Sequence, residues 1–218
     1  MKNELEILNL YTDPDSLRDV LKAPFEQNGY VVASDGYCLI RIEKSVINGS
    51  YNHQDYPKIA GEGSEKLFPS TNHGCRMSID DFREAIKDAP QIEETKVVRD
   101  AVKCEECEGE GSVVWVYEAS ARDYEEEYDC PVCNGCGYSK EIKEKTGRMI
   151  ADPEAATMIQ DRYFLVRNIE RMIRTMELLE ADDVWLRFDT QRPYEQMQFE
   201  FVSKKVDGLM MPVRKPEN

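Results

Sequence analysis

The stretch Tyr30-Val-Val-Ala-Ser-Asp-Gly-Tyr-Cys-Leu-Ile-Arg-Ile42 predicts two β-strands joined by a tight turn. Apolar residues fill positions 30–33 and all of positions 39–42 except Arg41, and the Ser34-Asp35-Gly36 segment between them is typical of a turn. Two strands joined by so short a connection run antiparallel. The stretch therefore makes an antiparallel sheet the starting point of the fold.

Regular elements of both kinds surround this hairpin. We expect further strands at 5–10, 95–103, 113–118, 138–144, 184–188, 197–202 and 209–213. One helix is predicted over residues 13–23, a second begins at the capping box Ser78-Ile-Asp-Asp81 and ends before Pro90, and a third covers about residues 161–179. The repeated order of a helix followed by antiparallel strands predicts an α+β fold with helices on one face of the sheets. Residues 48–76, rich in Gly, Ser, Asn and His, are expected to form a long mobile loop.

The charge excludes one class of protein. The chain of 218 residues has 43 acidic and 28 basic residues and a net charge of −15, which argues against a protein that coats nucleic acid with its whole surface. No apolar run approaches the ~18 residues of a membrane span, and the first residues have no apolar signal core. We therefore expect a cytoplasmic protein without a membrane partner.

Five of the seven cysteines form two knuckles of the pattern CxxCxGxG. They are Cys104-Glu-Glu-Cys107-Glu-Gly-Glu-Gly and Cys130-Pro-Val-Cys133-Asn-Gly-Cys136-Gly. The two-residue spacing lets both thiolates of a knuckle reach one ion, so the pair predicts a structural Zn²⁺ site of Cys104, Cys107, Cys130 and Cys133. Cys136 is the alternative to Cys133, and a redox CxxC pair is the alternative to a metal. The knuckles resemble the cysteine-rich module of DnaJ-type co-chaperones, which implies zinc ligation; without a J-domain signature the chaperone function is not implied.

The segment 104–137 is expected to be a zinc-binding hairpin inserted into a body formed by residues 1–103 and 138–218. It carries ten acidic residues and one basic residue, a net charge of −9. Phosphate would be repelled by this charge. We expect the hairpin to be a structural staple or a protein-contact surface.

Basic residues recur on the three predicted helices of this acidic protein. On the third helix they lie opposite an apolar stripe formed by Leu165, Ile169, Met172, Met176 and Leu179. The complete set is Arg18, Lys22, Arg83, Lys87, Arg167, Arg171 and Arg174. Three such faces favour a shared anionic partner. The alternative is solvated faces with intrahelical ion pairs to Asp19, Glu84 and Glu170.

Several segments resemble bacterial DNA sliding clamps, the beta subunit of the replicative polymerase. Residues 30–39 are similar to the "TDGHRL" strand and turn of that family, and Leu209-Met-Met-Pro-Val-Arg214 is similar to its closing "MPxR" strand. Residues 75–86 resemble the second helix of a clamp domain, and residues 162–188 resemble the last helix and strand of the final domain. The resemblance covers roughly residues 1–47, 75–100 and 160–214.

The resemblance implies a role in binding DNA and partner peptides without catalysis. Clamp domains are α+β units whose helices face double-stranded DNA and contact its backbone without reading sequence, so the seven basic residues above become candidate DNA contacts. It also implies a cleft that captures short peptides of partner proteins. By position the cleft would comprise Ser34, Gly36, Tyr37, Leu39, Met210, Met211, Pro212 and Val213. A closed ring would need several copies of the chain, hence a homo-oligomer. The alternative is that Leu39 and Val213 are core residues.

The chain departs from the family in three ways. Tyr37-Cys38 replaces the His-Arg of the family turn, the length allows about one and a half clamp domains, and the zinc hairpin is foreign to clamps. We find no Walker A, HExxH, GxSxG or Rossmann pattern, so no catalysis is expected. The leading hypothesis is a shortened clamp-like DNA replication accessory of a phage or mobile element. The alternative is a zinc-stabilised protein-interaction adaptor, or a clamp or DNA mimic, that acts on a host factor without binding DNA.

Overall fold

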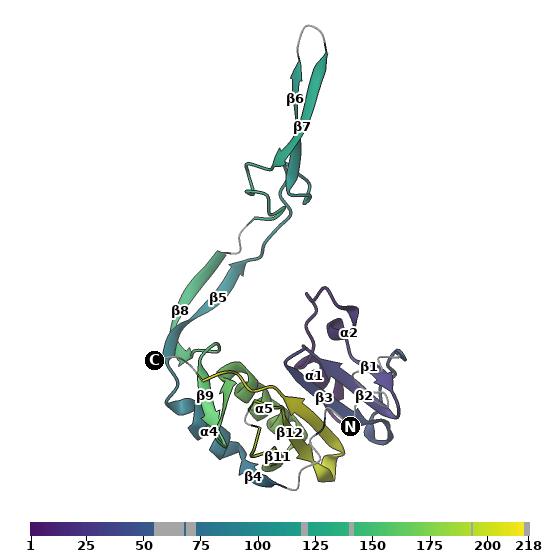
Figure 1. Ribbon diagram of the computed structural model, residues 1–218, viewed down its shortest axis with the longest axis vertical. Coiled ribbons are helices and arrows are strands. Elements are labelled where there is room, and N and C mark those ends of the chain that lie inside the picture. The colour runs from purple at the N-terminus through teal and green to yellow at the C-terminus, as the bar shows by residue number, and fades with distance from the viewer. Residues whose placement is uncertain (55–67, 69–72, 119–121, 140–141, 193, 216–218) are drawn as a thin grey trace. The chain divides into compact units, whose positions relative to one another are not determined.

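The computed structural model describes residues 1–54, 68, 73–118, 122–139, 142–192 and 194–215 (Figure 1). The chain divides into two compact units: Met1–Pro90 with Ala151–Asn218, here called the body, and Gln91–Ile150, here called the inserted unit. The fold is α+β with antiparallel sheets, as the sequence predicts. The inserted unit extends beyond the predicted 104–137 on both sides.

The body is built on one seven-stranded antiparallel sheet. Its order is β1-β2-β3-β13-β12-β11-β4. The strands are β1 (Phe25–Gln27), β2 (Tyr30–Ser34), β3 (Cys38–Glu43), β4 (Gly74–Ser78), β11 (Asp183–Arg187), β12 (Met197–Phe201) and β13 (Val206–Met210). The hairpin predicted at 30–42 is confirmed as β2 and β3, and it pairs directly with the C-terminal strand β13.

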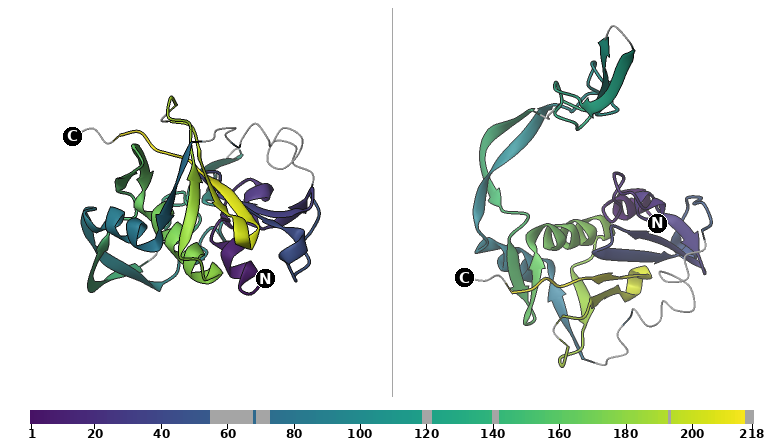
Figure 2. Two further views of the ribbon diagram at one scale, coloured as in Figure 1. Left: turned by 90° about the horizontal axis from the view of Figure 1, so that it is seen from below. Right: turned by 45° about the horizontal axis from the view of Figure 1, so that its top comes forward.

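Alternation along the strands gives the sheet two apolar faces. Val31, Ala33 and Ile40 belong to the main core, which also contains Ile169 and Met172 of the helix α5 (Val166–Leu179). This helix lies against one face of the sheet (Figure 2). The opposite face carries a smaller cluster of Phe25, Val32, Leu39 and Leu209. Successive side chains of a strand point to opposite faces, so one hairpin supplies both clusters.

The capping-box prediction is confirmed. Helix α4 (Ile79–Lys87) begins where the Ser78 hydroxyl accepts a hydrogen bond from the Asp81 amide at 3.2 Å, and the Asp81 carboxylate accepts one from the Ser78 amide at 2.7 Å. Phe82 of α4 is fully buried in the main core. Four residues of the predicted apolar stripe, Ile169, Met172, Met176 and Leu179, are buried on α5, whereas the fifth, Leu165, is half-buried and ends β10.

The strand predicted at 5–10 is wrong, because these residues form the helix α1 (Glu4–Asn9). Ile7, Leu8 and Tyr11 are buried in the main core, whereas Leu5 is 54% exposed. Positions i, i+1 and i+4 share one side of a helix but not one face of a strand. Packing of this short segment against the core therefore decides its conformation.

Two predicted helices are shorter than expected. Of residues 13–23 only α2 (Asp19–Lys22) is helical, and Leu17 is fully exposed. The helix predicted from residue 161 begins at Val166, because β10 (Arg162–Leu165) pairs with β9 (Ala156–Ile159). Gln160 and Asp161 make the turn between these strands with positive φ angles of 50° and 62°. Such angles cannot continue a right-handed helix.

The inserted unit consists of two antiparallel ribbons. β5 (Gln91–Arg99) pairs with β8 (Ile142–Ala151), and β6 (Ser112–Glu118) pairs with β7 (Asp123–Asp129). The cysteine knuckles lie between these ribbons in the chain, where an isolated bridge joins Lys103 to Tyr138. The β5–β8 ribbon accounts for the additional length of the unit.

The remaining short elements are the 3₁₀ turns η1 (Lys44–Val46) and η3 (Val202–Lys204). Of the loop predicted at 48–76, residues 55–67 and 69–72 lie outside the described residues, and its last residues belong to β4. None of the helices in the described part of the chain has the length and apolar character that crossing a bilayer requires.

Candidate functional sites

Four buried cysteine sulfurs converge in the inserted unit. The Sγ atoms of Cys104, Cys107, Cys130 and Cys133 all lie within 4.8 Å of one another. The Cys104–Cys130 and Cys107–Cys133 sulfur pairs are 3.8 and 3.7 Å apart. Four sulfurs placed tetrahedrally at the Zn–S distance of ~2.3 Å would be about 3.8 Å apart. The arrangement therefore has the donor set and the size of a four-thiolate metal site.

Reciprocal backbone contacts bring the two knuckles together. The Cys104 amide donates to the Gly137 carbonyl at 2.9 Å, and the Cys130 amide donates to the Gly111 carbonyl at 2.7 Å. Gly111 and Gly137 have φ angles of 85° and 76°. A Cβ on Gly111 would lie 2.4 Å from the Gly135 oxygen, and one on Gly137 would lie 2.5 Å from the Gly109 oxygen. Glycine is required at both places for conformation and for space.

The glycines also donate to the sulfurs. The Gly111 amide lies 3.3 Å from Cys107 Sγ, and the Gly137 amide lies 3.1 Å from Cys133 Sγ. Burial alone raises the pKa of Cys107, but the Gly111 and Gly109 amides and the neighbouring thiols bring it down to about 7. The pKa of Cys133 is raised, by burial first and also by the thiols beside it. Neighbouring thiols such as those of Cys107 and Cys133 lose their protons one after the other, because the first negative charge opposes the second. The Gly111 and Gly137 amides favour the thiolate form, which is the form that binds metal.

Cys136 lies outside this cluster. Its sulfur lies 2.8 Å from the Cys133 carbonyl oxygen and 2.9 Å from that of Tyr138, which share its single S–H donor, and the residue is exposed. The geometry therefore favours Cys133 over Cys136 as the fourth sulfur of the site.

The two sequence segments assigned to a peptide cleft are adjacent in the body. In the β3–β13 register, Leu39 pairs with Leu209 and Cys38 pairs with Met210. The Met211 amide extends this pairing by donating to the Tyr37 carbonyl at 2.9 Å. We call Gly36, Tyr37, Met211, Pro212 and Val213, the residues at this end of the two strands that retain exposed surface, the β3–β13 surface.

Three predicted cleft residues are buried instead. Met210 is 1% exposed and belongs to the main core, Leu39 belongs to the smaller cluster, and Ser34 is buried beneath the turn. Tyr37 and Met211 remain 58% and 40% exposed. Cys38, between Tyr37 and Leu39, faces the core, and burial raises the pKa of its thiol to about 12.

The turn that presents Tyr37 is fixed by Asp35. Its Oδ1 accepts hydrogen bonds from the amides of Tyr37 at 2.8 Å and Cys38 at 2.7 Å. The Ser34 hydroxyl donates to the Cys38 carbonyl at 2.8 Å. Gly36 adopts a φ of 90°, a conformation that favours glycine. The turn predicted at Ser34-Asp35-Gly36 is therefore held by side-chain hydrogen bonds of Ser34 and Asp35 and by the left-handed conformation of Gly36.

Arg171 is placed differently from the prediction. It was expected on an exposed basic face, but its side chain is 16% exposed and lies 2.7 Å from Asp35 Oδ2. Its guanidinium also lies over the Tyr11 ring, 5.2 Å from the centroid. Tyr11, just after α1, and Asp35 of the β2–β3 turn therefore cover this position of α5. The ion pair between Arg171 and Asp35 was not predicted from the sequence. The turn motif around Asp35 was the only local feature that pointed to this part of the chain.

The other basic residues do not form one shared face. Val20 of α2 packs into the smaller cluster, on the sheet face that α5 does not cover, so Arg18 and Lys22 are separated from the α4 and α5 set. Glu177 of α5 links α4 to α5, because it pairs with Arg83 of α4 at 3.2 Å and with Arg174 of its own helix at 3.4 Å. The common face predicted for three helices is therefore confined to α4 and α5.

Carboxylates accompany nearly all of these bases. Two of the intrahelical pairs expected under the alternative are present, Lys22–Asp19 at 2.9 Å and Lys87–Glu84 at 3.1 Å. Arg167 pairs with Glu154, and Arg174 pairs with Glu6 at 2.6 Å as well as with Glu177. Glu170, expected as a partner, has no ion pair among the described residues, and burial raises its pKa.

Comparison with known proteins gives structural matches only. No protein-family model and no curated protein sequence matches this chain. The beta subunit of DNA polymerase III from Pseudomonas aeruginosa is 11% identical, with a TM-score of 0.45 over 96% of this chain and 63% of that one. The DNA polymerase sliding clamp from Caulobacter crescentus is 13% identical, with a TM-score of 0.47 over 99% and 65%.

The beta subunit of DNA polymerase III from Thermotoga maritima is also 13% identical, with a TM-score of 0.46 over 99% and 65%. This chain thus spans less than two thirds of the length of these proteins. The alignments extend over nearly all of this chain.

Proposed function

We propose that this chain is a sliding-clamp-like, DNA-associated accessory protein without catalytic activity, which captures short peptides of partner proteins at the β3–β13 surface. The pairing of β3 with β13 carries the proposal, because it joins the two segments that resemble the clamp peptide cleft. Replication is the process in which such a protein would act, and a phage or mobile element is its proposed source. We further propose that its cysteine centre holds structural Zn²⁺.

The chemistry of the surface suits an extended apolar peptide. Tyr37 and Met211 offer a large aromatic ring and a flexible thioether next to each other, linked through their backbones. Methionine adapts its shape to different partners, which favours capture of varied sequences. Pro212 and Val213 are half-buried and extend the apolar surface beyond the strand. A peptide with apolar side chains at alternate positions could place them here.

We choose griselimycin as the probe, because sliding clamps from Pseudomonas aeruginosa and Bartonella birtlesii have been solved bound to it. We expect fluorescently labelled griselimycin to bind the full chain, and the double variant Tyr37→Ala/Met211→Ala to weaken binding about tenfold. The loss reflects two exposed apolar contacts of roughly 0.7 kcal/mol each. Fluorescence anisotropy measures both affinities.

Met158→Ala is the matched control for this pair. Met158 lies on β9 of the same unit and is 55% exposed, so its removal tests a similar loss of apolar surface elsewhere. Binding that is absent in the native chain, or equally affected by Met158→Ala, would refute capture at the β3–β13 surface.

Contact with double-stranded DNA through α4 and α5 is the second part of the proposal. Arg83, Arg167 and Arg174 are the arginines of these helices with exposed side chains, at 51%, 40% and 49%. Their carboxylate partners must be displaced before phosphate can bind. A ring around DNA would require further copies of the chain, so a homo-oligomer is proposed with this contact.

The ion pairs favour a second candidate function. A protein-interaction adaptor, or a clamp or DNA mimic acting on a host factor, would use the same peptide surface without touching DNA. Exposed pairs such as Arg174–Glu6 neutralise the face that a DNA-binding protein would leave basic. Retention on DNA separates the two functions.

We expect the full chain to be retained on nicked circular plasmid at low salt, in a gel-filtration assay. The triple variant Arg83→Gln/Arg167→Gln/Arg174→Gln should lose retention and flatten its salt dependence, because each phosphate contact contributes about one counterion to the slope. Arg192→Gln is the control, since Arg192 is an exposed body arginine paired with Glu195 at 2.7 Å. No retention of the native chain would favour the adaptor.

A further inference from the structure

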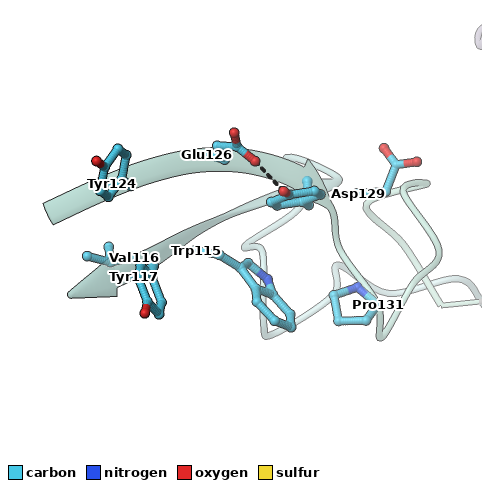
Figure 3. Close-up of a pocket in the computed structure, with 8 residues that line it drawn as sticks. Trp115, Val116, Tyr117, Tyr124, Glu126, Asp129 and Pro131 are labelled. Carbon is cyan, nitrogen blue, oxygen red and sulfur yellow. Dashed lines mark hydrogen bonds between the residues drawn. The ribbon is translucent and has the colours of Figure 1, made fainter. Parts of the chain in front are cut away.

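One face of the β6–β7 hairpin gathers four exposed aromatic side chains. In this antiparallel pair Trp115 lies opposite Glu126, Tyr117 opposite Tyr124, and Val113 opposite Tyr128. Residues directly opposite each other point to the same side of a ribbon. We call Trp115, Tyr117, Tyr124 and Tyr128 the aromatic face; they line a shallow pocket together with Glu126 and Pro131 (Figure 3).

These rings are not the core of the hairpin. Their exposed fractions are 61% for Trp115, 70% for Tyr117, 47% for Tyr124 and 51% for Tyr128. Trp115 and Tyr128 contact each other edge to face, with centroids 6.1 Å apart. The only buried apolar cluster described in the inserted unit is the cysteine centre with Val113. A contiguous exposed apolar patch of this kind marks an interaction surface.

The charge of the hairpin selects the partner. Segment 104–137 has a net charge of −9, which repels nucleic acid, anionic lipid and a second copy of the same hairpin. Glu126 lies on the aromatic face itself and accepts a hydrogen bond from the Tyr128 hydroxyl (Figure 3). A cationic segment of another protein would be attracted to this surface by its charge.

The hairpin already contains one example of the contact expected. The Arg122 guanidinium lies over the Tyr124 ring, 4.6 Å from its centroid. A guanidinium is planar and weakly hydrated, so it stacks on aromatic rings more readily than an ammonium group does. Trp115 and Tyr117 offer further rings next to carboxylates, and arginine side chains at alternate positions of an extended segment could reach them.

We propose that the aromatic face docks an extended, arginine-rich segment of a partner protein. This interaction does not depend on the β3–β13 surface, which lies in the other unit, so it goes beyond the function proposed above. Arginine is preferred over lysine because the rings, and not only the carboxylates, contribute to binding.

The test uses the full zinc-loaded chain and two labelled peptides, one of alternating arginine and glycine and one of alternating lysine and glycine. Near physiological salt we expect the arginine peptide to bind more tightly. The variant Trp115→Ala/Tyr117→Ala should weaken arginine-peptide binding about tenfold and reduce the arginine preference. Val114→Ala, on the other face of the same strand and outside the pocket, is the matched control and should leave binding unchanged.

Three results would overturn the proposal. The native chain could fail to bind the arginine peptide, the aromatic variant could bind it as tightly as the native chain, or the control variant could lose as much affinity. Zinc content of both variants, measured in parallel, shows that the hairpin base is intact in each.

Discussion

Replacing Cys130 with serine is expected to abolish stoichiometric zinc binding and to unfold the segment between Lys103 and Tyr138. Cys130 is completely buried, and its sulfur lies 3.8 Å from that of Cys104. A serine hydroxyl does not supply the thiolate that the ion requires. Structural zinc stabilises small peptide domains by about 10–16 kcal/mol, and the cysteine cluster is the buried core of this segment. Losing the metal therefore removes most of what orders it.

Metal analysis and a ¹H–¹⁵N spectrum of the full chain measure the two effects together. The matched control is Cys136→Ser, because Cys136 belongs to the same knuckle but lies outside the cluster. The control should retain one zinc per chain, and signals of the body should persist in both variants, because the body has its own core. One zinc per chain in Cys130→Ser would contradict the four-cysteine assignment.

The second large effect is expected from Arg171→Met, which should lower the free energy of unfolding of the body by about 3 kcal/mol. The substitution leaves the Asp35 carboxylate, 13% exposed, without the guanidinium that lies 2.7 Å away. Removing one partner of a mostly buried ion pair costs more than the pair itself contributes. Urea denaturation followed by circular dichroism measures the change.

Arg174→Met is the control on the same helix. Arg174 is 49% exposed and its partner Glu6 is 51% exposed, so the loss of this pair should cost less than about 1 kcal/mol. Equal losses in the two variants would contradict the role of Arg171 in holding the β2–β3 turn.

The parts of the fold that local sequence determines were predictable. The β2–β3 hairpin follows from turn residues between two apolar runs, and the cysteine centre follows from two-residue spacing with glycines that permit the required backbone. The α4 capping box is similarly local. The interactions that fix the hairpin turn, the capping box and each separate knuckle lie within a few residues, whereas the pairing of the two knuckles joins cysteines 26 residues apart.

Features that depend on contacts distant in sequence were not predictable. Arg171 lies opposite the apolar stripe of its helix, yet it is enclosed by Tyr11, which follows α1, and by Asp35 of the β2–β3 turn. The segment at 5–10 is apolar at four of its six positions and was predicted as a strand, but its burial against the main core selects a helix. The residues of the β5–β8 ribbon are mostly exposed. Its sequence therefore offered no pattern of buried positions that would have placed the ribbon in the inserted unit.

Capture of peptide-like ligands at the β3–β13 surface can be tested by recording ¹H–¹⁵N spectra of the native chain during a titration with griselimycin. We expect the largest shifts at the amides of Tyr37 and Met211, two residues joined by the 2.9 Å hydrogen bond from the Met211 amide to the Tyr37 carbonyl. Shifts centred on any other part of the chain, or a spectrum that does not change, would contradict capture at this surface.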